Sequence, residues 1–212
     1  MKLYSYFMSS AAYRVRIALN LKGVDYETVP VDLSRGEHRQ PAFLATNPQA
    51  TVPVIDDDGI VLWQSLAIID YLDARYPFPR LIPAEPVVRA RVQAQAQLIV
   101  CEIHPLNNLR VLKYLKHSVG ASEDAKNAWY RHWVEQGLAS VEALLVRGGK
   151  AGQHCLGDLP TLADACLVPQ IFNAQRFDCR LDHVPQVMRI FEHCMALDAF
   201  ANAAPARQPD AE

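Results

Sequence analysis

Residues 52–63, Val-Pro-Val-Ile-Asp-Asp-Asp-Gly-Ile-Val-Leu-Trp, decide how the first part of the chain folds. Two short apolar runs rich in β-branched residues flank the acidic stretch, and an Asp-Gly pair between such runs is typical of a β-hairpin turn. The aspartates do not predict a calcium loop, because Gly59 stands at the wrong offset and no later glutamate closes the loop. We therefore predict two paired strands here.

The residues before the hairpin alternate between extended and helical patterns. Lys2–Phe7 predicts a strand, Ala12–Lys22 predicts a helix that Gly23 ends, and Tyr26–Val31 predicts a second extended run. After the hairpin, Ser65 is expected to cap a helix whose apolar residues recur at helical spacing until Pro77. The order β-α-β, hairpin, α predicts a small mixed sheet covered by helices.

Beyond this α/β part the chain shows helical periods and no strand-like alternation. Residues 77–86 contain four prolines, so they cannot form a helix interior. We predict an α/β domain at 1–80, a linker at 81–86 and an all-helical domain at 87–212. The expected helices cover about 87–117 with a kink at Pro105, 130–149, 161–175 after a capping box of Thr161 and Asp164, and 184–200. The tail from Ala203 is expected to fray.

Composition excludes several functional classes. The chain has 212 residues and a net charge of −2 from 21 basic and 23 acidic residues, which provides no electrostatic footprint for nucleic acid or an anionic membrane. No segment has the apolar length of a membrane span, and the first residues do not resemble a cleavable signal. We therefore expect a cytoplasmic globular protein that binds neither nucleic acid nor membrane.

The cysteines and histidines do not predict a metal or disulfide site. The five cysteines lie at positions 101, 155, 166, 179 and 194, and none forms a Cys-x-x-Cys pair, so neither a disulfide framework nor a zinc site is indicated. About four in five such cysteines are expected to be buried as small apolar residues. The seven histidines form no ligand cluster, so no metal is expected. The first hundred residues contain no thiol.

Several motifs resemble the zeta class of glutathione transferases, and together they span nearly the whole chain. The sharpest is Ser9-Ser10-Ala11-Ala12-Tyr13-Arg14-Val15-Arg16-Ile17-Ala18-Leu19. The further matching stretches are residues 47–53 (Asn-Pro to Val-Pro), 64–69 (Gln-Ser-Leu-Ala-Ile-Ile), 103–110 (Ile-His-Pro-Leu-Asn-Asn-Leu-Arg), and 162–170 (Leu-Ala-Asp-Ala-Cys-Leu-Val-Pro-Gln) through Arg176-Phe177. Any one alone would be weak, but the set is specific.

The resemblance implies a two-domain glutathione transferase fold, with a thioredoxin-like N-terminal domain and an all-α C-terminal domain. It implies a homodimer that uses glutathione to isomerise a small cis dicarboxylate such as maleylacetoacetate or maleylpyruvate, in aromatic amino acid catabolism such as tyrosine degradation. Glutathione thiolate would add to the double bond, the resulting single bond would rotate, and elimination would release the trans product. Because the first hundred residues contain no thiol, a protein dithiol in the thioredoxin-like domain cannot supply the sulfur.

By resemblance, Ser9 donates to the glutathione sulfur at the start of the first helix, with Ser10 as the alternative donor. The simpler interpretation of either serine is helix capping. Val52 would offer its backbone to the cysteinyl part of glutathione beside a cis Pro53. Gln64 and Ser65 at the next helix start would receive the γ-glutamyl carboxylate, although Ser65 is also a capping candidate.

The second domain supplies the remaining candidates. His104 and Asn108, four residues apart on one expected helix face, approach the cofactor and substrate by resemblance, although an isolated histidine is more often structural. Arg176 is expected to hold a substrate carboxylate through its bidentate fork, unless it merely offsets the dipole at a helix C-terminus. Arg110 is the next candidate for the same task.

Two positions depart from the family pattern. Met8 stands where relatives commonly have an arginine, and Ala11 stands where many have a cysteine. The loss of the arginine removes a carboxylate anchor, so Met8 bears on substrate choice. One alternative is therefore a transferase or dehalogenase acting on small α-halo acids or other electrophiles. Another is a non-catalytic module for protein association, which the retained serines and the Gln-Ser pair disfavour.

Overall fold

The computed structural model describes residues 1–211, and the chain divides into two compact units. The first unit contains Met1–Ile82 together with the segment that begins at Ala196, and the second contains Pro83–Met195. The sequence pattern places everything after residue 86 in the helical domain, whereas the structure assigns the segment from Ala196 to the first unit. We call residues 196–211 the returning segment.

The first unit is built on a four-stranded mixed sheet of order β2-β1-β3-β4. The strand β1 pairs in parallel with β2, with Leu3 opposite Thr28, and antiparallel with β3, with Leu3 opposite Ile55. The elements of this unit are β1 (Lys2–Ser5), α1 (Ser10–Leu21), β2 (Glu27–Pro30), α2 (Pro41–Thr46), β3 (Val54–Asp57), β4 (Ile60–Trp63), α3 (Ser65–Arg75) and α9 (Asp198–Ala201). This arrangement confirms the predicted α/β fold.

The predicted hairpin is present between β3 and β4. Asp57 pairs with Ile60, so Asp58 and Gly59 form a two-residue turn, with φ values of 53° and 90°. Positive φ at both positions is what a type I′ hairpin requires, which explains the Asp-Gly pair. The Asp56 carboxylate accepts from the Gly59 N–H at 2.8 Å and holds the turn.

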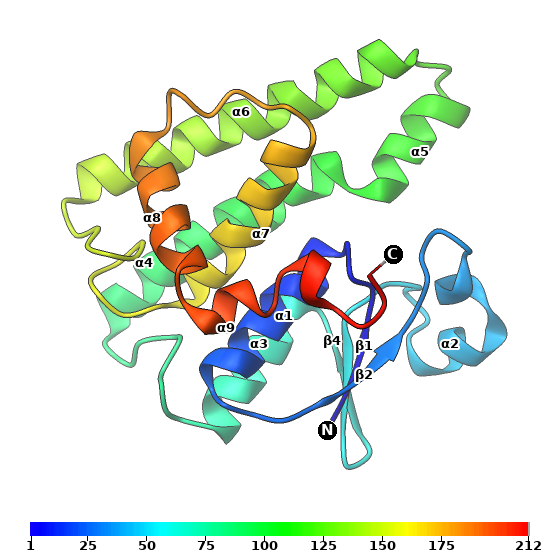
Figure 1. The fold of residues 1–212 in the computed structure, drawn as a ribbon, viewed down its shortest axis with the longest axis horizontal. Coiled ribbons are helices and arrows are strands. Elements are labelled where there is room, and N and C mark those ends of the chain that lie inside the picture. The colour runs from blue at the N-terminus through cyan, green and yellow to red at the C-terminus, as the bar shows by residue number, and fades with distance from the viewer. Residues whose placement is uncertain (212) are drawn as a thin grey trace. The chain divides into compact units, whose positions relative to one another are not determined.

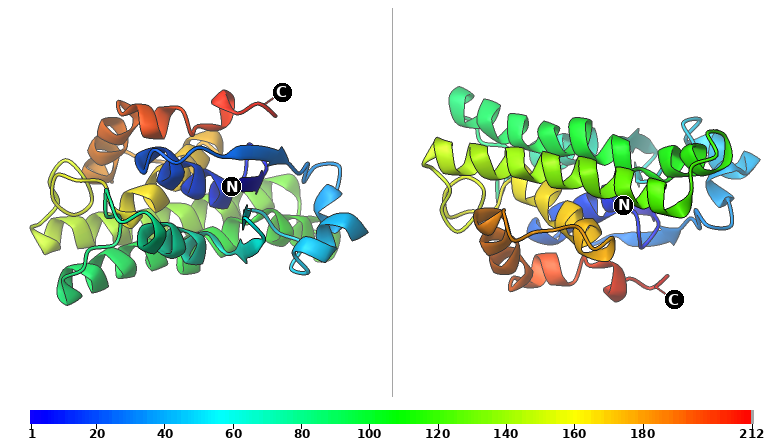
Figure 2. Two further views of the ribbon diagram at one scale, coloured as in Figure 1. Left: turned by 90° about the horizontal axis from the view of Figure 1, so that it is seen from below. Right: turned by 90° about the horizontal axis from the view of Figure 1, so that it is seen from above.

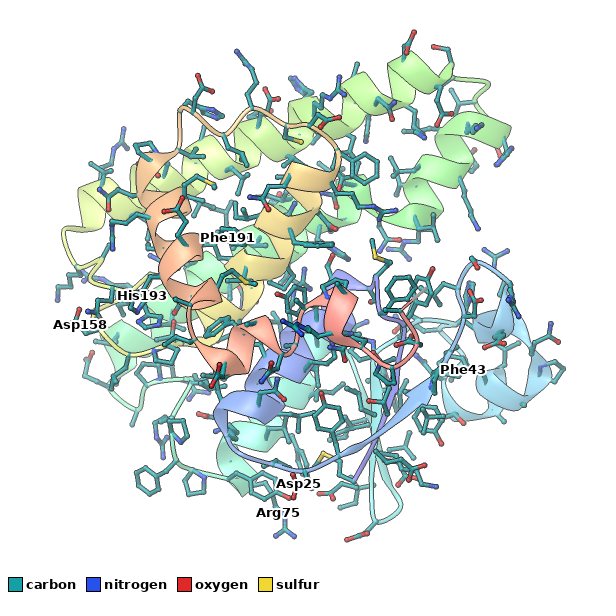
Figure 3. The ribbon with its side chains drawn as sticks, in the orientation of Figure 1. Asp25, Phe43, Arg75, Asp158, Phe191 and His193 are labelled. Carbon is teal, nitrogen blue, oxygen red and sulfur yellow. The ribbon has the colours of Figure 1, made fainter. Side chains whose placement is uncertain are left out.

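Two helices and a small apolar cluster support the sheet. Figure 1 shows α1 and α3 side by side, with α9 next to α1. A separate cluster of Val31, Phe43, Val52 and Val54 lies near α2, and Figure 3 marks Phe43 in it. The Tyr4 ring packs edge-on against Phe43 with centroids 6.2 Å apart. This cluster supports the chain where it enters β3.

The start of the predicted linker is fixed to the first unit by a buried carboxylate. Asp73 in α3 accepts from the backbone N–H groups of Leu81 at 2.7 Å and Ile82 at 3.2 Å. The Lys22 ammonium, 2.9 Å away, balances its charge. Since Leu81 and Ile82 are also buried, residues 81–82 belong structurally to the first unit.

The second unit consists of helices whose order is α4 (Pro86–Gln97), α5 (Leu109–His117), α6 (Glu123–Gly148), α7 (Leu162–Arg176) and α8 (Pro185–Met195). Figure 2 shows the helix α4 running alongside the long helix α6. The π-helical segment Leu98–Ile103 contacts α6 at Gly137, where a β-carbon would collide with the Ile103 side chain. The lack of a side chain at Gly137 therefore allows this close contact.

The prediction of one kinked helix over 87–117 was wrong. The π-helical segment is followed by a 3₁₀ turn, His104–Asn107, and a new helix then begins after Asn108. Pro105 cannot donate a backbone hydrogen bond and clashes with the preceding turn, so the helix breaks rather than bends. The predicted helix over 184–200 is likewise split into α8 and α9.

The capping box of α7 is confirmed. The buried Asp164 carboxylate accepts from the Thr161 N–H and the Thr161 hydroxyl, both at 2.8 Å. Its other oxygen accepts from the Cys155 N–H at 2.7 Å. One carboxylate thus joins the helix start to the loop before it.

Candidate functional site

The turn between β1 and α1 carries the serine pair. Ser9 is the N-cap of α1, and its Oγ accepts from the Ala12 N–H at 3.2 Å. The capping interpretation is therefore confirmed, but it does not exclude the catalytic one. A hydroxyl has two acceptor lone pairs and one proton, so a capping serine can still donate that proton to a sulfur. Ser10 is the first helical residue and is buried, whereas Ser9 is half-buried.

Three residues around the serine pair complete this turn. The Ser9 N–H donates to the Tyr6 carbonyl at 2.9 Å, and the Ser9 carbonyl accepts from Tyr13 at 2.8 Å. Met8 is half-buried directly before the serines, so its side chain adjoins the turn without a charge. The backbone of Ser9 is therefore fixed on both sides.

The second site element is the loop that leads into β3. The Val52–Pro53 bond is cis, as expected. Val52 is buried, yet within the described part of the chain its backbone N–H and carbonyl make no hydrogen bond. Buried backbone groups are almost always paired, so this pair of groups fits an extended ligand backbone that adds to the edge.

The buried side chain of Asn47 shapes this loop, a role that the sequence analysis missed. Its Nδ2 donates to the Thr51 carbonyl at 2.8 Å, and its Oδ1 accepts from the Gln49 N–H at 3.0 Å. An asparagine followed by proline is a turn signal that could have pointed to it.

The third element is the start of α3, where one prediction needs correction. Ser65 is the first helical residue and not its cap; Gln64 is the N-cap, in a positive-φ conformation of 72°. A non-glycine residue in that region is uncommon and often marks a functional site. The Gln64 amide nitrogen donates to Gln49 Oε1 at 2.9 Å, which joins the helix start to the loop before Val52.

Positive charge lies beneath the start of α3. Arg14 of α1 is buried and donates from Nη1 to the Ser65 Oγ at 3.3 Å. The sequence analysis did not assign Arg14 a role, although an arginine on an otherwise apolar helix face is a usable signal. Together with the free N–H groups of a helix N-terminus, this guanidinium makes the position suitable for a carboxylate.

The second unit positions His104 and Asn108 together, but not as expected. They lie in the 3₁₀ turn and at the N-cap of α5, not on one continuous helix face. Even so, Asn108 Nδ2 approaches His104 Nε2 to 3.3 Å, and Asn108 Oδ1 caps α5 by accepting from the Arg110 N–H at 3.1 Å. Arg110 itself is exposed.

Arg176 ends α7 and is exposed beside an aromatic stack. Its guanidinium lies over the Phe177 ring at 5.5 Å, and Phe177 stacks on Tyr130 with centroids 3.8 Å apart. The Phe177 carbonyl accepts from Arg131 at 2.9 Å. Two separate helices, α5 and α7, thus carry the two candidate carboxylate anchors of the second unit.

Burial makes several of the protein's thiols poorly suited to nucleophilic chemistry. Four of the five cysteines are buried, as predicted, and Cys101 is exposed. Burial raises the pKa of Cys179 to about 12, and it raises the pKa values of Cys155 and Cys194 as well. Such thiols stay protonated near neutral pH.

The histidines and acidic residues do not assemble a metal site. Among residues 1–211, no group of three or more histidine, cysteine or acidic side chains could hold a metal ion. His154 and His193 do contact each other, with ring centroids 5.0 Å apart, and Figure 3 marks His193 and Asp158 in that part of the second unit. Desolvation lowers the pKa of His154, which favours a neutral ring. Within the same residues, no helix is long and apolar enough to cross a bilayer.

Comparison with known proteins agrees with this fold. Residues 1–74 match the family model for the glutathione S-transferase N-terminal domain. The chain is 51% identical over 213 residues to a maleylacetoacetate isomerase of Pseudomonas aeruginosa, covering 99% of this chain and 98% of that protein. The chain belongs to the glutathione transferase superfamily and, within it, to the zeta-class family of maleylacetoacetate and maleylpyruvate isomerases.

Two solved structures are similar over their whole lengths. One is the holo structure of a maleylpyruvate isomerase, described as a bacterial zeta-class glutathione S-transferase, with a TM-score of 0.98, 48% identity and complete coverage of both chains. The other is a maleylacetoacetate isomerase of Methylobacterium extorquens AM1 with bound malonate and glutathione, with a TM-score of 0.94, 41% identity and complete coverage of both.

Proposed function

We propose that this protein is a glutathione-dependent cis–trans isomerase of a small dicarboxylate such as maleylacetoacetate or maleylpyruvate. The observation that carries the proposal is identity of about half the residues over essentially the full length with proteins named for that activity. Aromatic amino acid catabolism, including tyrosine degradation, in the cytoplasm is the setting that we propose.

The residues of the first unit fit glutathione. Val52 offers an unpaired backbone edge, the start of α3 offers N–H groups above Arg14, and Ser9 retains a hydroxyl proton. We assign Val52, Pro53, Gln64 and Ser65 to binding of the cofactor. The first unit, Met1–Ile82 with the returning segment, would then form the glutathione-binding domain, and Pro83–Met195 would form the substrate domain.

Bound glutathione supplies a thiolate that adds to the cis double bond and leaves again after rotation about the carbon–carbon bond. Ser9 stabilises that thiolate by donating its hydroxyl proton, aided by the positive end of α1. A hydrogen bond to a charged group contributes about 1.5–3 kcal/mol, equivalent to about one to two pKa units. Ser10 is the alternative donor.

In the second unit, Arg176 is assigned to a substrate carboxylate, with Arg110 as a further anchor. The exposed guanidinium of Arg176 is held beside Phe177 and is open to a ligand. We assign His104 and Asn108, which contact each other, to the cofactor and substrate from this unit. Met8 leaves the turn before Ser9 without a cation.

Catalytic use of glutathione is the test of the proposed function. Maleylacetoacetate or maleylpyruvate is followed by its ultraviolet spectrum with glutathione far below the substrate concentration. We expect many turnovers for each glutathione, and S-methylglutathione, which has no free thiol, should support none. Stoichiometric loss of glutathione, or halide release from α-halo acids without isomerisation, would instead support the transferase or dehalogenase alternative.

Glutathione binding can be measured separately. Isothermal titration should show saturable binding with a dissociation constant of about 10⁻⁶–10⁻³ M, the range that is usual for small-molecule sites. The absence of binding would contradict the enzymatic proposal and leave a non-catalytic module.

We also propose that the protein is a homodimer with a two-fold isologous interface. Light scattering should report about twice the chain mass of 23.7 kDa at working concentration. A mass near that of one chain would contradict the proposal.

A further inference from the structure

The returning segment packs along α1 and reaches the turn before Ser9. The Phe200 carbonyl accepts from the Tyr13 hydroxyl at 3.4 Å, and the Ala199 carbonyl accepts from Asn20 Nδ2 at 3.0 Å. Figure 1 shows the returning segment close to β1 and α1 within this unit. The expectation that the tail from Ala203 frays is therefore wrong, because Ala203 and Pro205 are buried.

The buried guanidinium of Arg16 joins this segment to the turn. Its Nε donates to the Ala203 carbonyl at 2.9 Å, and its Nη2 donates to the Phe7 carbonyl at 3.0 Å. Nη1 donates to the Ser5 Oγ at 3.0 Å. One side chain thus holds β1, the turn and the returning segment at once.

Asp210 binds the other backbone group of Phe7. Its Oδ2 accepts from the Phe7 N–H at 2.9 Å, across 203 residues of sequence. Burial lowers the pKa of Arg16 to about 10, and Tyr26, Tyr13 and, least of the three, Asp210 counter that effect. The N–H of Phe7 is therefore bound by a carboxylate and its carbonyl by a guanidinium, while Ser9 lies two residues further on.

The Phe7 contacts and the Ser9 cap form one connected backbone path. The Ser9 N–H donates a hydrogen bond to the Tyr6 carbonyl. That carbonyl and the Phe7 N–H, which donates to Asp210, belong to the same peptide group. A shift at Phe7 therefore changes where the Ser9 hydroxyl points. Such a displacement of the Ser9 hydroxyl would lower turnover, because catalytic hydrogen bonds depend on placement to within about 1 Å.

We propose that Asp210, acting through Phe7 and opposite Arg16, is a positioning residue for the Ser9 hydroxyl, so the returning segment is part of the thiol-activating site. This inference rests on the proposed function. It requires no contact between Asp210 and glutathione.

Asp210→Ala tests the proposal, with Asp198→Asn as a control in the same segment. The first readout needs no ligand: hydrogen exchange of the Phe7 amide should accelerate about tenfold or more in Asp210→Ala, since its acceptor is gone. The second is the ultraviolet titration of glutathione thiolate on the protein, which should show a raised thiol pKa. Turnover at neutral pH should fall about three- to tenfold, while the KM for the dicarboxylate stays unchanged.

Asp210→Asn keeps an acceptor but not the charge, so it should show an intermediate effect, because charge-assisted hydrogen bonds are about twice as strong as neutral ones. Wild-type amide exchange and thiol pKa in Asp210→Ala would overturn the proposal. Should that variant fail to fold, an unchanged thiol pKa in Asp210→Asn would overturn it. Failure of the proposed function itself is distinguishable, since the unmodified protein would then neither bind glutathione nor isomerise the substrate.

Discussion

The two units hold their candidate site residues in different ways. In the first unit, Ser9 and Val52 present a cap hydroxyl and a backbone edge, and buried polar side chains fix both turns. In the second unit, Arg110 and Arg176 present long side chains from exposed positions on helices. Under the proposed function, backbone and caps would recognise the cofactor, while exposed side chains would select the substrate. Substitutions in the second unit should then change specificity more readily than the use of glutathione.

The largest expected effect is on the stability of the fold and not on the candidate site. Asp164→Ala leaves three donors around a fully buried position without an acceptor, so the free energy of unfolding should fall by about 3–5 kcal/mol. Urea unfolding measures this loss as a lower midpoint. The control is Asp182→Ala, an exposed acid that should cost less than about 0.5 kcal/mol. A loss of similar size in both variants would mean that the capping box does not hold the second unit together.

The next effect concerns the proposed carboxylate anchors. Met8→Arg should restore a charge-assisted anchor of about 1.5–3 kcal/mol and lower the KM of a dicarboxylate about ten- to a hundredfold. A monocarboxylate should change little. Arg176→Ala should raise the KM of both. If neither variant changes the KM, neither position touches substrate, and Arg110 becomes the anchor to test.

Ser9→Ala and Ser10→Ala are a matched pair for the first unit. Without the Ser9 proton, the pKa of bound glutathione should rise, and turnover at neutral pH should fall by about tenfold or more. The lost cap should also cost about 1 kcal/mol of stability, measurable by urea unfolding. Ser10→Ala should keep turnover. The reverse ranking in activity would move the thiol-activating role to Ser10.

The smallest effect tests the thiols of the second unit. A neutral alkylating agent at neutral pH should label Cys101 first, because it is exposed and the other four cysteines are buried. Peptide mapping by mass spectrometry identifies the labelled residue. Cys101→Ser should abolish this rapid labelling and leave isomerase activity unchanged. Rapid labelling of Cys179 would contradict the burial that raises its pKa to about 12.

Local signals in the sequence predicted elements of both units well. The Asp-Gly turn, the alternating strands and the capping box all rest on residues within a few positions of each other, where turn and capping chemistry apply directly. The confirmed cis bond at Pro53 came from the family resemblance, since most bonds before proline are trans.

The misses share a different cause. The spacing of apolar residues did not indicate that Pro105 would divide the expected helix into π-helical, 3₁₀ and α-helical parts. These helix types differ in which carbonyl accepts from each backbone N–H, and the apolar spacing does not specify that choice. Gln64 was missed as a cap because its positive φ is set by its surroundings. The order of the returning segment depends on partners such as Phe7 that are far away in the sequence.

The path of the chain has a consequence for biosynthesis. The first unit begins at Met1, but it is completed by residues that follow the whole helical unit. A nascent chain leaving the ribosome after residue 82 lacks the carbonyls of Ala199, Phe200 and Ala203 that accept from α1. The turn at Phe7 therefore receives its last partner only after the segment from Ala196 to Asp210 has been synthesised. Cutting the chain between the two units would separate that turn from Asp210. The suitable design for studying the first unit alone is a permuted chain that joins Met1–Ile82 directly to the segment from Ala196.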